Sequence, residues 1–160
     1  MIAEKMLGAD DLLAGCLPAE RLGRLGVIQE AMTWIGTPYH HEGRIRGAGV
    51  DCGMFLLEVF EAEGLIPHID PAPYPHDWHL HKSAEIYLGH VLEHCQKVET
   101  PLPGDVALFK FGRCLSHGGI MLDGRSMIHS YFGRGVVIDD LDTSETLGKR
   151  LAGFFSIWRR

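Results

Sequence analysis

The chain of 160 residues has the length of one domain, and its 46% hydrophobic and 22% charged residues suit one packed core rather than global disorder. The formal net charge is −6 and the Lys and Arg residues are scattered, so we expect no nucleic-acid partner. No apolar run approaches the roughly 20 residues that span a bilayer, so we expect no membrane association. The absence of an export signal predicts synthesis in the cytoplasm.

Four cysteines, Cys16, Cys52, Cys95 and Cys114, are irregularly spaced and include no C-x-x-C pair. A domain with this much apolar content does not need disulfides to fold. We therefore expect four free thiols in a reducing compartment and ask which of them is reactive.

The first half of the sequence predicts helices. Residues 1–17 are weakly patterned and are expected to form a loose N-terminal arm. Residues 18–35 carry apolar side chains at three- and four-residue steps, which predicts a helix. After a glycine-containing loop over 36–50, Asp51 is a favoured N-cap for a second helix over 52–63. That helix is apolar almost all round, so we expect it to be buried.

The second half predicts mainly strands. Several prolines make 67–75 an extended loop, and 82–95 are expected to form a third helix. Short apolar runs separated by turn signals then predict strands at 106–109, 119–122, 127–131, 136–138 and 154–158. Helices followed by a strand meander indicate an α+β fold, with the helices packed on one face of an antiparallel sheet.

Cys52 lies at the predicted start of the buried helix, where backbone N–H groups are unpaired and the helix dipole is positive. Both features favour the thiolate and predict a pKa below the ordinary value of roughly 8.5. The same N–H groups point to where an oxyanion forms when sulfur attacks a carbonyl. The alternative is that Cys52 only packs as a small apolar side chain.

Two histidines flank a predicted turn. His117 is placed at the entry to one strand and His129 in the next, with Asp123-Gly124 between them, so we expect the two side chains to lie close together across a hairpin. A nucleophilic cysteine needs a base, and the base needs a third group that orients its ring. Taken alone, either histidine is more simply a core residue whose hydrogen bonds are satisfied, or a surface residue. The order of a cysteine at a helix start followed by two histidines on a hairpin favours catalysis.

Five short motifs occur in one order along the chain: Gly36–Tyr39, Gly49–Gly53, Leu102–Val106, His117–Ile120 and Ile128–His129. Their order and spacing resemble those of the NlpC-type cysteine peptidases, which are papain-like bacterial cell-wall hydrolases. The resemblance runs from about residue 25 to 158 and is far more specific than any single motif. It implies a papain-like fold, and together with the weakly patterned start of the chain we expect an N-terminal arm over 1–17 and a single peptidase domain over 18–160.

The resemblance implies that Cys52 is the nucleophile, His117 the base and His129 the polar third member. The implied substrate is the γ-D-glutamyl–diaminopimelyl link of peptidoglycan stem peptides. The expected mechanism is acyl transfer through a thioester, started by a thiolate–imidazolium pair of Cys52 and His117. The resemblance implies neither a metal nor an organic cofactor.

Further residues receive roles from the same resemblance. Tyr39 and Asp51 are expected to line the pocket that reads the free amino end of the peptide. Gly53 is also placed among the substrate-binding residues, and it stands where the family usually has a serine. The turn at Pro103–Asp105 is expected to be structural and to lead the chain into the first central strand.

The proline-rich segment and the residues after it, 70–81, resemble the branch of the family that tailed phages and prophages encode. This implies phage tail proteins as partners and a virion that carries the enzyme to the cell wall.

Two rival functions remain, together with one alternative site. The domain could serve as a non-catalytic structural or assembly component of a phage tail. It could also be an acyltransferase or amidase that uses the same three residues on a lipid or a small amide. A zinc site could be drawn from His76, His79, His81, His90 and His94, but their spacing matches no recognised ligand pattern, so we expect no metal.

Overall fold

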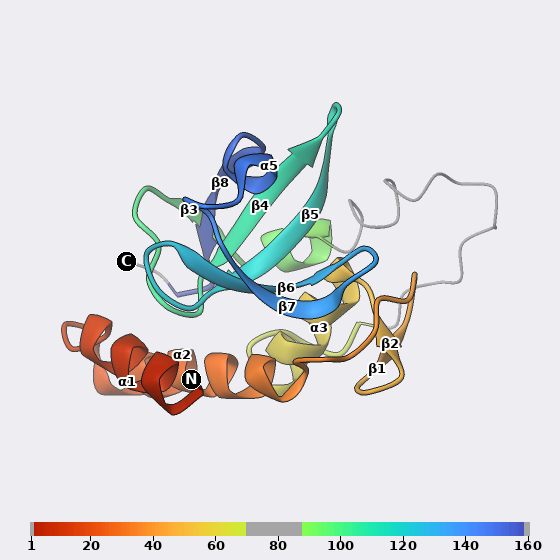
Figure 1. The fold of residues 1–160 in the computed structure, drawn as a ribbon. Helices are drawn as coiled ribbons and strands as arrows, with labels where there is room; N and C mark the ends of the chain where they lie inside the picture. The colour runs from red at the N-terminus through yellow and green to blue at the C-terminus, as the bar shows by residue number, and fades with distance from the viewer. Residues whose placement is uncertain (1, 70–87, 159–160) are drawn as a thin grey trace.

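Residues 2–69 and 88–158 are described by the computed structural model, and they form a layer of helices beneath an antiparallel sheet (Figure 1). The N-terminal helices are α1 (Ile2–Leu12), α2 (Pro18–Thr33) and α3 (Cys52–Ala62). Residues 88–92 are also helical. The expected helices over 18–35 and 52–63 are confirmed as α2 and α3. Of the expected helix over 82–95, the part before residue 88 lies outside the described residues.

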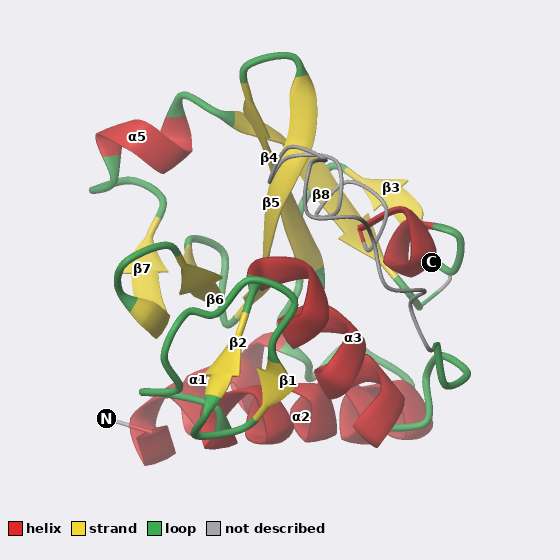
Figure 2. Cartoon of the chain, turned by 90° about the vertical axis from the view of Figure 1, so that its right-hand side faces the viewer, coloured by secondary structure: helices red, strands yellow, loops and turns green. Residues whose placement is uncertain are grey.

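The main sheet joins six strands in the order β3-β8-β4-β5-β6-β7, and neighbouring strands are antiparallel. Their bounds are β3 (Gln96–Val98), β4 (Val106–Phe111), β5 (Cys114–Met121), β6 (Ser126–Tyr131), β7 (Gly135–Asp140) and β8 (Leu151–Ser156). A short helix, α5 (Glu145–Gly148), precedes β8. Two further short strands, β1 (Arg44–Ile45) and β2 (Gly49–Val50), form a separate hairpin beside α3 (Figure 2). The predicted α+β fold is thus confirmed.

Each of the five predicted strands is present, but β5 starts earlier than expected. Its first residue is Cys114, so His117 lies within the strand rather than at its entry. The pairing of β4 with β5 shifts between Phe109 and Lys110, which marks a bulge next to the residue paired with His117. The three-residue strand β3 was not predicted, because so short a segment carries too little periodicity to be recognised.

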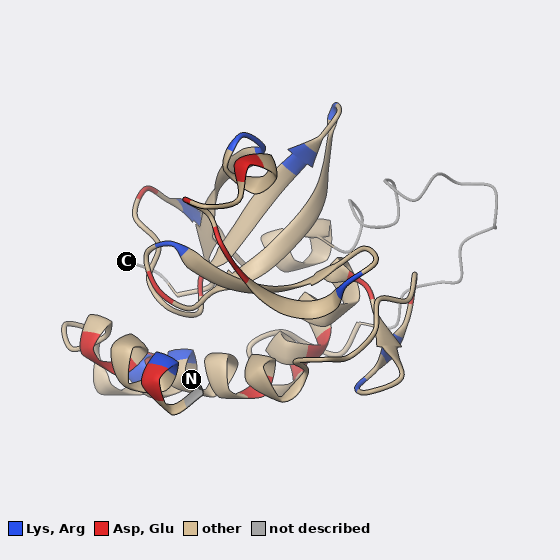
Figure 3. Cartoon of the chain, in the orientation of Figure 1, with Lys and Arg blue, Asp and Glu red and all other residues tan. Residues whose placement is uncertain are grey.

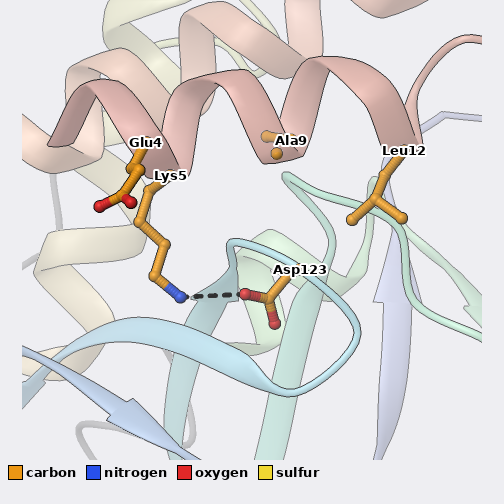
Figure 4. Close-up of a pocket in the computed structure, with 6 residues that line it drawn as sticks. Glu4, Lys5, Ala9, Leu12 and Asp123 are labelled. Carbon is orange, nitrogen blue, oxygen red and sulfur yellow. Dashed lines mark hydrogen bonds and ion pairs between the residues drawn. The ribbon is translucent and has the colours of Figure 1, made fainter. Parts of the chain in front are cut away.

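The first 17 residues are not a loose arm, because residues 2–12 form helix α1 and pack on the rest of the fold. Ala9 and Leu13 are fully buried. Lys5 donates hydrogen bonds to the Asp123 carboxylate at 3.0 Å and to the Ser126 hydroxyl at 2.9 Å, which ties α1 to the turn between β5 and β6 (Figure 4). These contacts are far apart in sequence, which explains why local patterning did not reveal them.

Apolar side chains cover both faces of the central strands. On the face toward the helices, Phe55, Leu56 and Phe60 of α3 are fully buried. On the other face, Phe109 and Met121 belong to a second apolar cluster. A strand buried on both faces reads as a continuous apolar run, which is the pattern of β4.

Leucine side chains pack closely over Gly118 in β5, and one of them comes from α3. A Cβ atom there would stand 2.9 Å from Cδ2 of Leu88 and 3.0 Å from Cδ1 of Leu56. Real Cβ atoms are rarely so close to other atoms, so the glycine lets helix and strand pack tightly at this point. The start of α3 is thereby held against β5.

Arg24 of α2 is fully buried and is held by groups from three other parts of the chain. Its Nη1 donates to the Asp105 carboxylate at 2.9 Å, and its Nη2 donates to the Ser156 hydroxyl at 3.1 Å. The guanidinium lies 4.2 Å from the centroid of the Trp158 ring. Asp105 also accepts a hydrogen bond from the Leu102 N–H at 2.8 Å. The Pro103–Asp105 turn thus has the structural role expected of it.

We predict that Arg24→Met lowers the free energy of unfolding by about 3–5 kcal/mol, because it removes the cation that pairs with the buried Asp105 carboxylate. Urea unfolding of the two proteins measures the difference. Arg21→Met is the matched control: it removes an arginine from the same helix, but the ion pair of Arg21 with Asp10 is exposed to solvent. Equal, small losses in both variants would contradict a stabilising role for the buried pair.

Candidate active site

Cys52 is the first residue of α3, and Asp51 caps the helix. Asp51 has an extended backbone (φ −92°, ψ 178°), and its Oδ1 accepts a hydrogen bond from the Met54 N–H at 2.8 Å. This is the geometry of an N-cap, which was expected from the sequence. The Cys52 sulfur is 3.6 Å from the carbonyl oxygen of Ser116 in β5. The backbone N–H groups of Gly118, Gly53 and Cys52 itself favour the thiolate form of the same sulfur.

His117 and His129 are brought together by the β5–β6 hairpin. The strand register pairs Ile120 with Ile128, and its continuation places Gly119 opposite His129, with His117 on the same face. The His117 Nε2 and His129 Nδ1 atoms are 2.7 Å apart. A Cβ atom on Gly119 would stand 3.0 Å from the His129 Cβ, so the glycine makes room for this ring. The expected proximity of the two histidines is confirmed.

The Cys52 thiol contacts β5 at the residue that precedes His117. The carbonyl that accepts the Cys52 thiol belongs to Ser116, the residue directly before His117. Because Nε2 of His117 contacts His129, its free ring nitrogen is Nδ1. In this state the thiol is directed to the carbonyl rather than to the ring.

Burial favours the neutral form of both groups, which opposes the expected thiolate–imidazolium pair. Burial, assisted by the nearby Asp51 charge, raises the pKa of the Cys52 thiol to about 12, despite the backbone N–H groups that favour the thiolate. Burial and the neighbouring His129 lower the pKa of His117 to about 3. Cys52 is only 5% exposed to solvent, and His117 is only 6% exposed. The cost of removing a charge from water thus exceeds the favourable effect of the helix start.

Sequence reasoning missed a carboxylate behind the two histidines. His129 Nε2 is 3.0 Å from Asp139 Oδ2 in β7, and Arg134 forms a two-pronged ion pair with Asp139 at 2.7 and 3.0 Å. A signal for it exists in the sequence. Counting outward from the Gly133–Gly135 turn pairs His129 with Val137, which puts Asp139 two residues away on the same face.

Tyr39 and Gly53, two of the three expected substrate-binding residues, lie beside the thiol. The Gly53 N–H favours the thiolate form of Cys52. Burial raises the pKa of the half-buried Tyr39 phenol, and the nearby Cys52 and Asp51 add to this effect. The Tyr39 ring packs edge-on against Phe132, with 5.4 Å between the ring centroids, and Phe132 is 74% exposed.

The third expected residue, Asp51, is buried and hydrogen-bonded to the backbone on both carboxylate oxygens. Besides the bond to Met54, its Oδ2 accepts a hydrogen bond from the Glu42 N–H at 2.7 Å. His41 Nδ1 is 3.9 Å from the same oxygen. Burial raises the pKa of Asp51, although these N–H groups and His41 oppose the effect. The carboxylate therefore shapes the loop before α3 as well as the start of the helix.

The structure describes only some of the histidines that were considered as zinc ligands. His76, His79 and His81 lie outside the described residues, and within 2–69 and 88–158 no three His, Cys, Asp or Glu side chains are grouped to hold a metal ion.

Among the helices that the structure describes, none is both long and apolar enough to cross a membrane. Acidic and basic residues are interspersed over helices and sheet (Figure 3).

Solved structures share this fold at low sequence identity. An NLP/P60 family protein from Staphylococcus aureus, described as similar to a lipoprotein, matches with a TM-score of 0.64 and 19% identity, over 87% of this chain and 42% of that one. The chain thus spans less than half of that protein. The NlpC/p60 domain of the peptidoglycan hydrolase SagA matches with a TM-score of 0.54 and 22% identity, over 82% of this chain and 96% of that domain.

The peptidoglycan hydrolase RipB from Mycobacterium tuberculosis matches over 99% of this chain and 85% of its own, with a TM-score of 0.60 and 16% identity. A comparison with curated protein sequences found no match. The model of the NlpC/P60 family matches residues 36–154. This region holds every residue of the site described above and covers most of the chain, which therefore belongs to the NlpC/P60 family.

Proposed function

We propose that the protein is a cysteine peptidase that hydrolyses an amide bond in peptidoglycan stem peptides. Cys52 is the nucleophile, His117 the general base and His129 the residue that orients the base. The observation that carries this proposal is the Cys52 thiol at the start of α3, which contacts the backbone of the residue before His117, together with the hydrogen bond between His117 and His129. Family membership supports it, as do the peptidoglycan hydrolases SagA and RipB, which share the fold.

The first chemical step starts from the neutral thiol. The thiol turns from the Ser116 carbonyl toward His117, and Nδ1 accepts its proton while the sulfur attacks the amide carbonyl carbon. Because the proton leaves as the carbon–sulfur bond forms, no free thiolate has to accumulate in the buried site. Burial and the neighbouring His129 lower the pKa of His117, so the ring is neutral at the start of the step and its Nδ1 lone pair accepts the thiol proton.

The tetrahedral intermediate collapses when the carbon–nitrogen bond breaks. His117 gives the proton from Nδ1 to the departing amine, and a thioester on Cys52 remains. Water then attacks the thioester carbon, with His117 accepting its proton and returning that proton to the sulfur as the acid is released. Thiol and imidazole are both regenerated in the neutral form.

The oxyanion has donors at the start of α3. The backbone N–H of Cys52 lies at the helix terminus, where N–H groups lack partners within the helix. The Tyr39 hydroxyl is a second donor. The raised pKa of Tyr39 keeps its proton on the oxygen, so it donates rather than repels the negative charge.

The proposal also covers which peptide bond is cut and where the protein acts. The bond is the γ-D-glutamyl–diaminopimelyl link, with Tyr39, Asp51 and Gly53 facing the amino side of the peptide. Association with a phage tail remains a prediction from the segment 70–81, which lies outside the described residues. A neutral, buried thiol would also suit a non-catalytic component of a phage tail. The experiments must therefore distinguish that role from catalysis.

We predict that Cys52→Ala and His117→Ala each lower kcat/KM on purified muropeptides by on the order of 10⁴-fold or more, the scale seen when a nucleophile or its base is removed. Cys114→Ser is the matched control, because it replaces another thiol in a described strand and should retain activity. The substrates are followed by mass spectrometry, alongside acyl-lipid amides. Full hydrolysis by Cys52→Ala would refute the assignment, and turnover of the lipids alone would favour the acyltransferase or amidase.

We predict that Tyr39→Phe lowers kcat by on the order of 10²-fold with little change in KM, because a donor to the oxyanion acts mainly in the transition state. Steady-state kinetics on a muropeptide separates the two constants. An increase in KM at constant kcat would instead assign Tyr39 to ground-state binding of the substrate.

The raised pKa of Cys52 predicts its reactivity without substrate. Alkylation of Cys52 by iodoacetamide should be slow at pH 6 and should rise roughly tenfold per pH unit toward pH 10, because only the thiolate reacts. Mass spectrometry of the digested protein gives the rate at each cysteine. A rate that levels off by about pH 7 would show a stable thiolate and contradict the neutral pair. Retained folding at each pH is checked by circular dichroism.

A further inference from the structure

The two histidines of the site are part of a longer chain of hydrogen bonds. From the thiol side it runs from His117 Nε2 to His129 Nδ1 at 2.7 Å, and from His129 Nε2 to Asp139 Oδ2 at 3.0 Å. Arg134 then holds both carboxylate oxygens of Asp139. We propose that Asp139, clamped by Arg134, is a positioning residue that sets the ring tautomers of His129 and His117, an inference that rests on the proposed function.

The number of protons on the two rings fixes their tautomers. A neutral imidazole carries one N–H, so it donates from one nitrogen and accepts at the other. An ionised carboxylate only accepts hydrogen bonds, so Asp139 requires the proton of His129 on Nε2. His129 Nδ1 is then an acceptor, which requires the proton of His117 on Nε2. The lone pair of His117 is thereby left on Nδ1, the nitrogen that takes the thiol proton.

The opposite arrangement is inactive. If His129 carried its proton on Nδ1, His117 would have to accept that hydrogen bond at Nε2 and place its own proton on Nδ1. The base would then present an N–H to the thiol instead of a lone pair. Without a fixed acceptor behind His129, both arrangements satisfy the hydrogen bond between the rings, so the carboxylate is what distinguishes them.

The environment of Asp139 keeps it ionised. Burial would raise its pKa, but the hydrogen bonds from Arg134 and His129 outweigh burial and lower it. The Arg134 guanidinium lies 5.9 Å from the centroid of the Tyr131 ring, and that ring packs against His117 with 5.5 Å between their centroids. Arg134 is half exposed and Asp139 is 17% exposed at the side chain, so the pair lies at the outer end of the chain of hydrogen bonds.

This placement makes the residue testable without unfolding the protein. Strand β7 is at the edge of the sheet in the described part of the chain, and ion pairs with solvent access contribute little to stability. Asp139→Asn keeps the shape and one acceptor oxygen but loses the charge, and its amide can donate to His129 Nε2. Asp140→Asn is the matched control: it is the next residue of β7, and its carboxylate pairs with Arg125 at 3.3 Å.

The first experiment observes the tautomers directly. Nitrogen-15 NMR of histidine-labelled protein at pH 7 should show protonated Nε2 and bare Nδ1 on both His117 and His129, with the signals assigned by single substitution. In Asp139→Asn the His129 and His117 signals should move to the other tautomer or to a mixture, while Asp140→Asn should match the wild type. Unchanged tautomers in Asp139→Asn would overturn the proposal, whatever the protein hydrolyses.

The second experiment tests the consequence for catalysis on a muropeptide. Asp139→Asn should lower kcat by about 10–100-fold with little change in KM, the loss typical when a group that orients a functional histidine is removed. In a His129→Gln background the same change should have no further effect, because Asp139 acts through His129. Additive losses in the double variant would overturn the proposal. If the wild type hydrolyses no muropeptide, the proposed function fails, and the NMR comparison alone decides the role of Asp139.

Discussion

The contact between the first turn of α3 and strand β5 is the constraint on which the rest of the site depends. Gly118 lets the helix approach the strand, and the Cys52 sulfur meets the backbone of Ser116 and Gly118. The same strand carries His117, so this contact packs the helix of the proposed nucleophile against the strand of the proposed base. Asp51 fixes the start of the helix, and the apolar side chains of α3 hold it against the sheet. The chemistry therefore relies on a helix that is part of the core.

Burial explains the acid–base state of the site. A helix start favours a thiolate, yet a thiol removed from water holds its proton, and the second effect is larger here. His117 is kept neutral by the same burial. In the proposed mechanism the pair therefore acts as a neutral base and a protonated nucleophile. In such a pair the ring tautomer matters more than in an ion pair, because a neutral base with its proton on the wrong nitrogen cannot act. The carboxylate behind His129 gains its importance from this.

Local signals predicted much of the fold and of the candidate site. The N-cap Asp51 and the apolar run after it predicted α3, and the turn between the two histidines predicted their hairpin. The docking of α1 through Lys5 could not be predicted, because its partners are more than 100 residues away in sequence. The pKa values of Cys52 and His117 depend on how tightly the whole fold encloses them, which no short motif encodes. Asp139 could have been found by counting across the Gly133–Gly135 turn.

Direct detection of the acyl-enzyme tests the central claim, which is that Cys52 attacks an amide carbonyl of a stem peptide. A muropeptide is mixed with the protein, the reaction is stopped with acid within milliseconds to seconds, and the intact protein is weighed by mass spectrometry. The account predicts a transient mass increase equal to the acyl half of the substrate, located on Cys52 after digestion. Turnover of the muropeptide with no adduct at any time, or with an adduct on another residue, would contradict it.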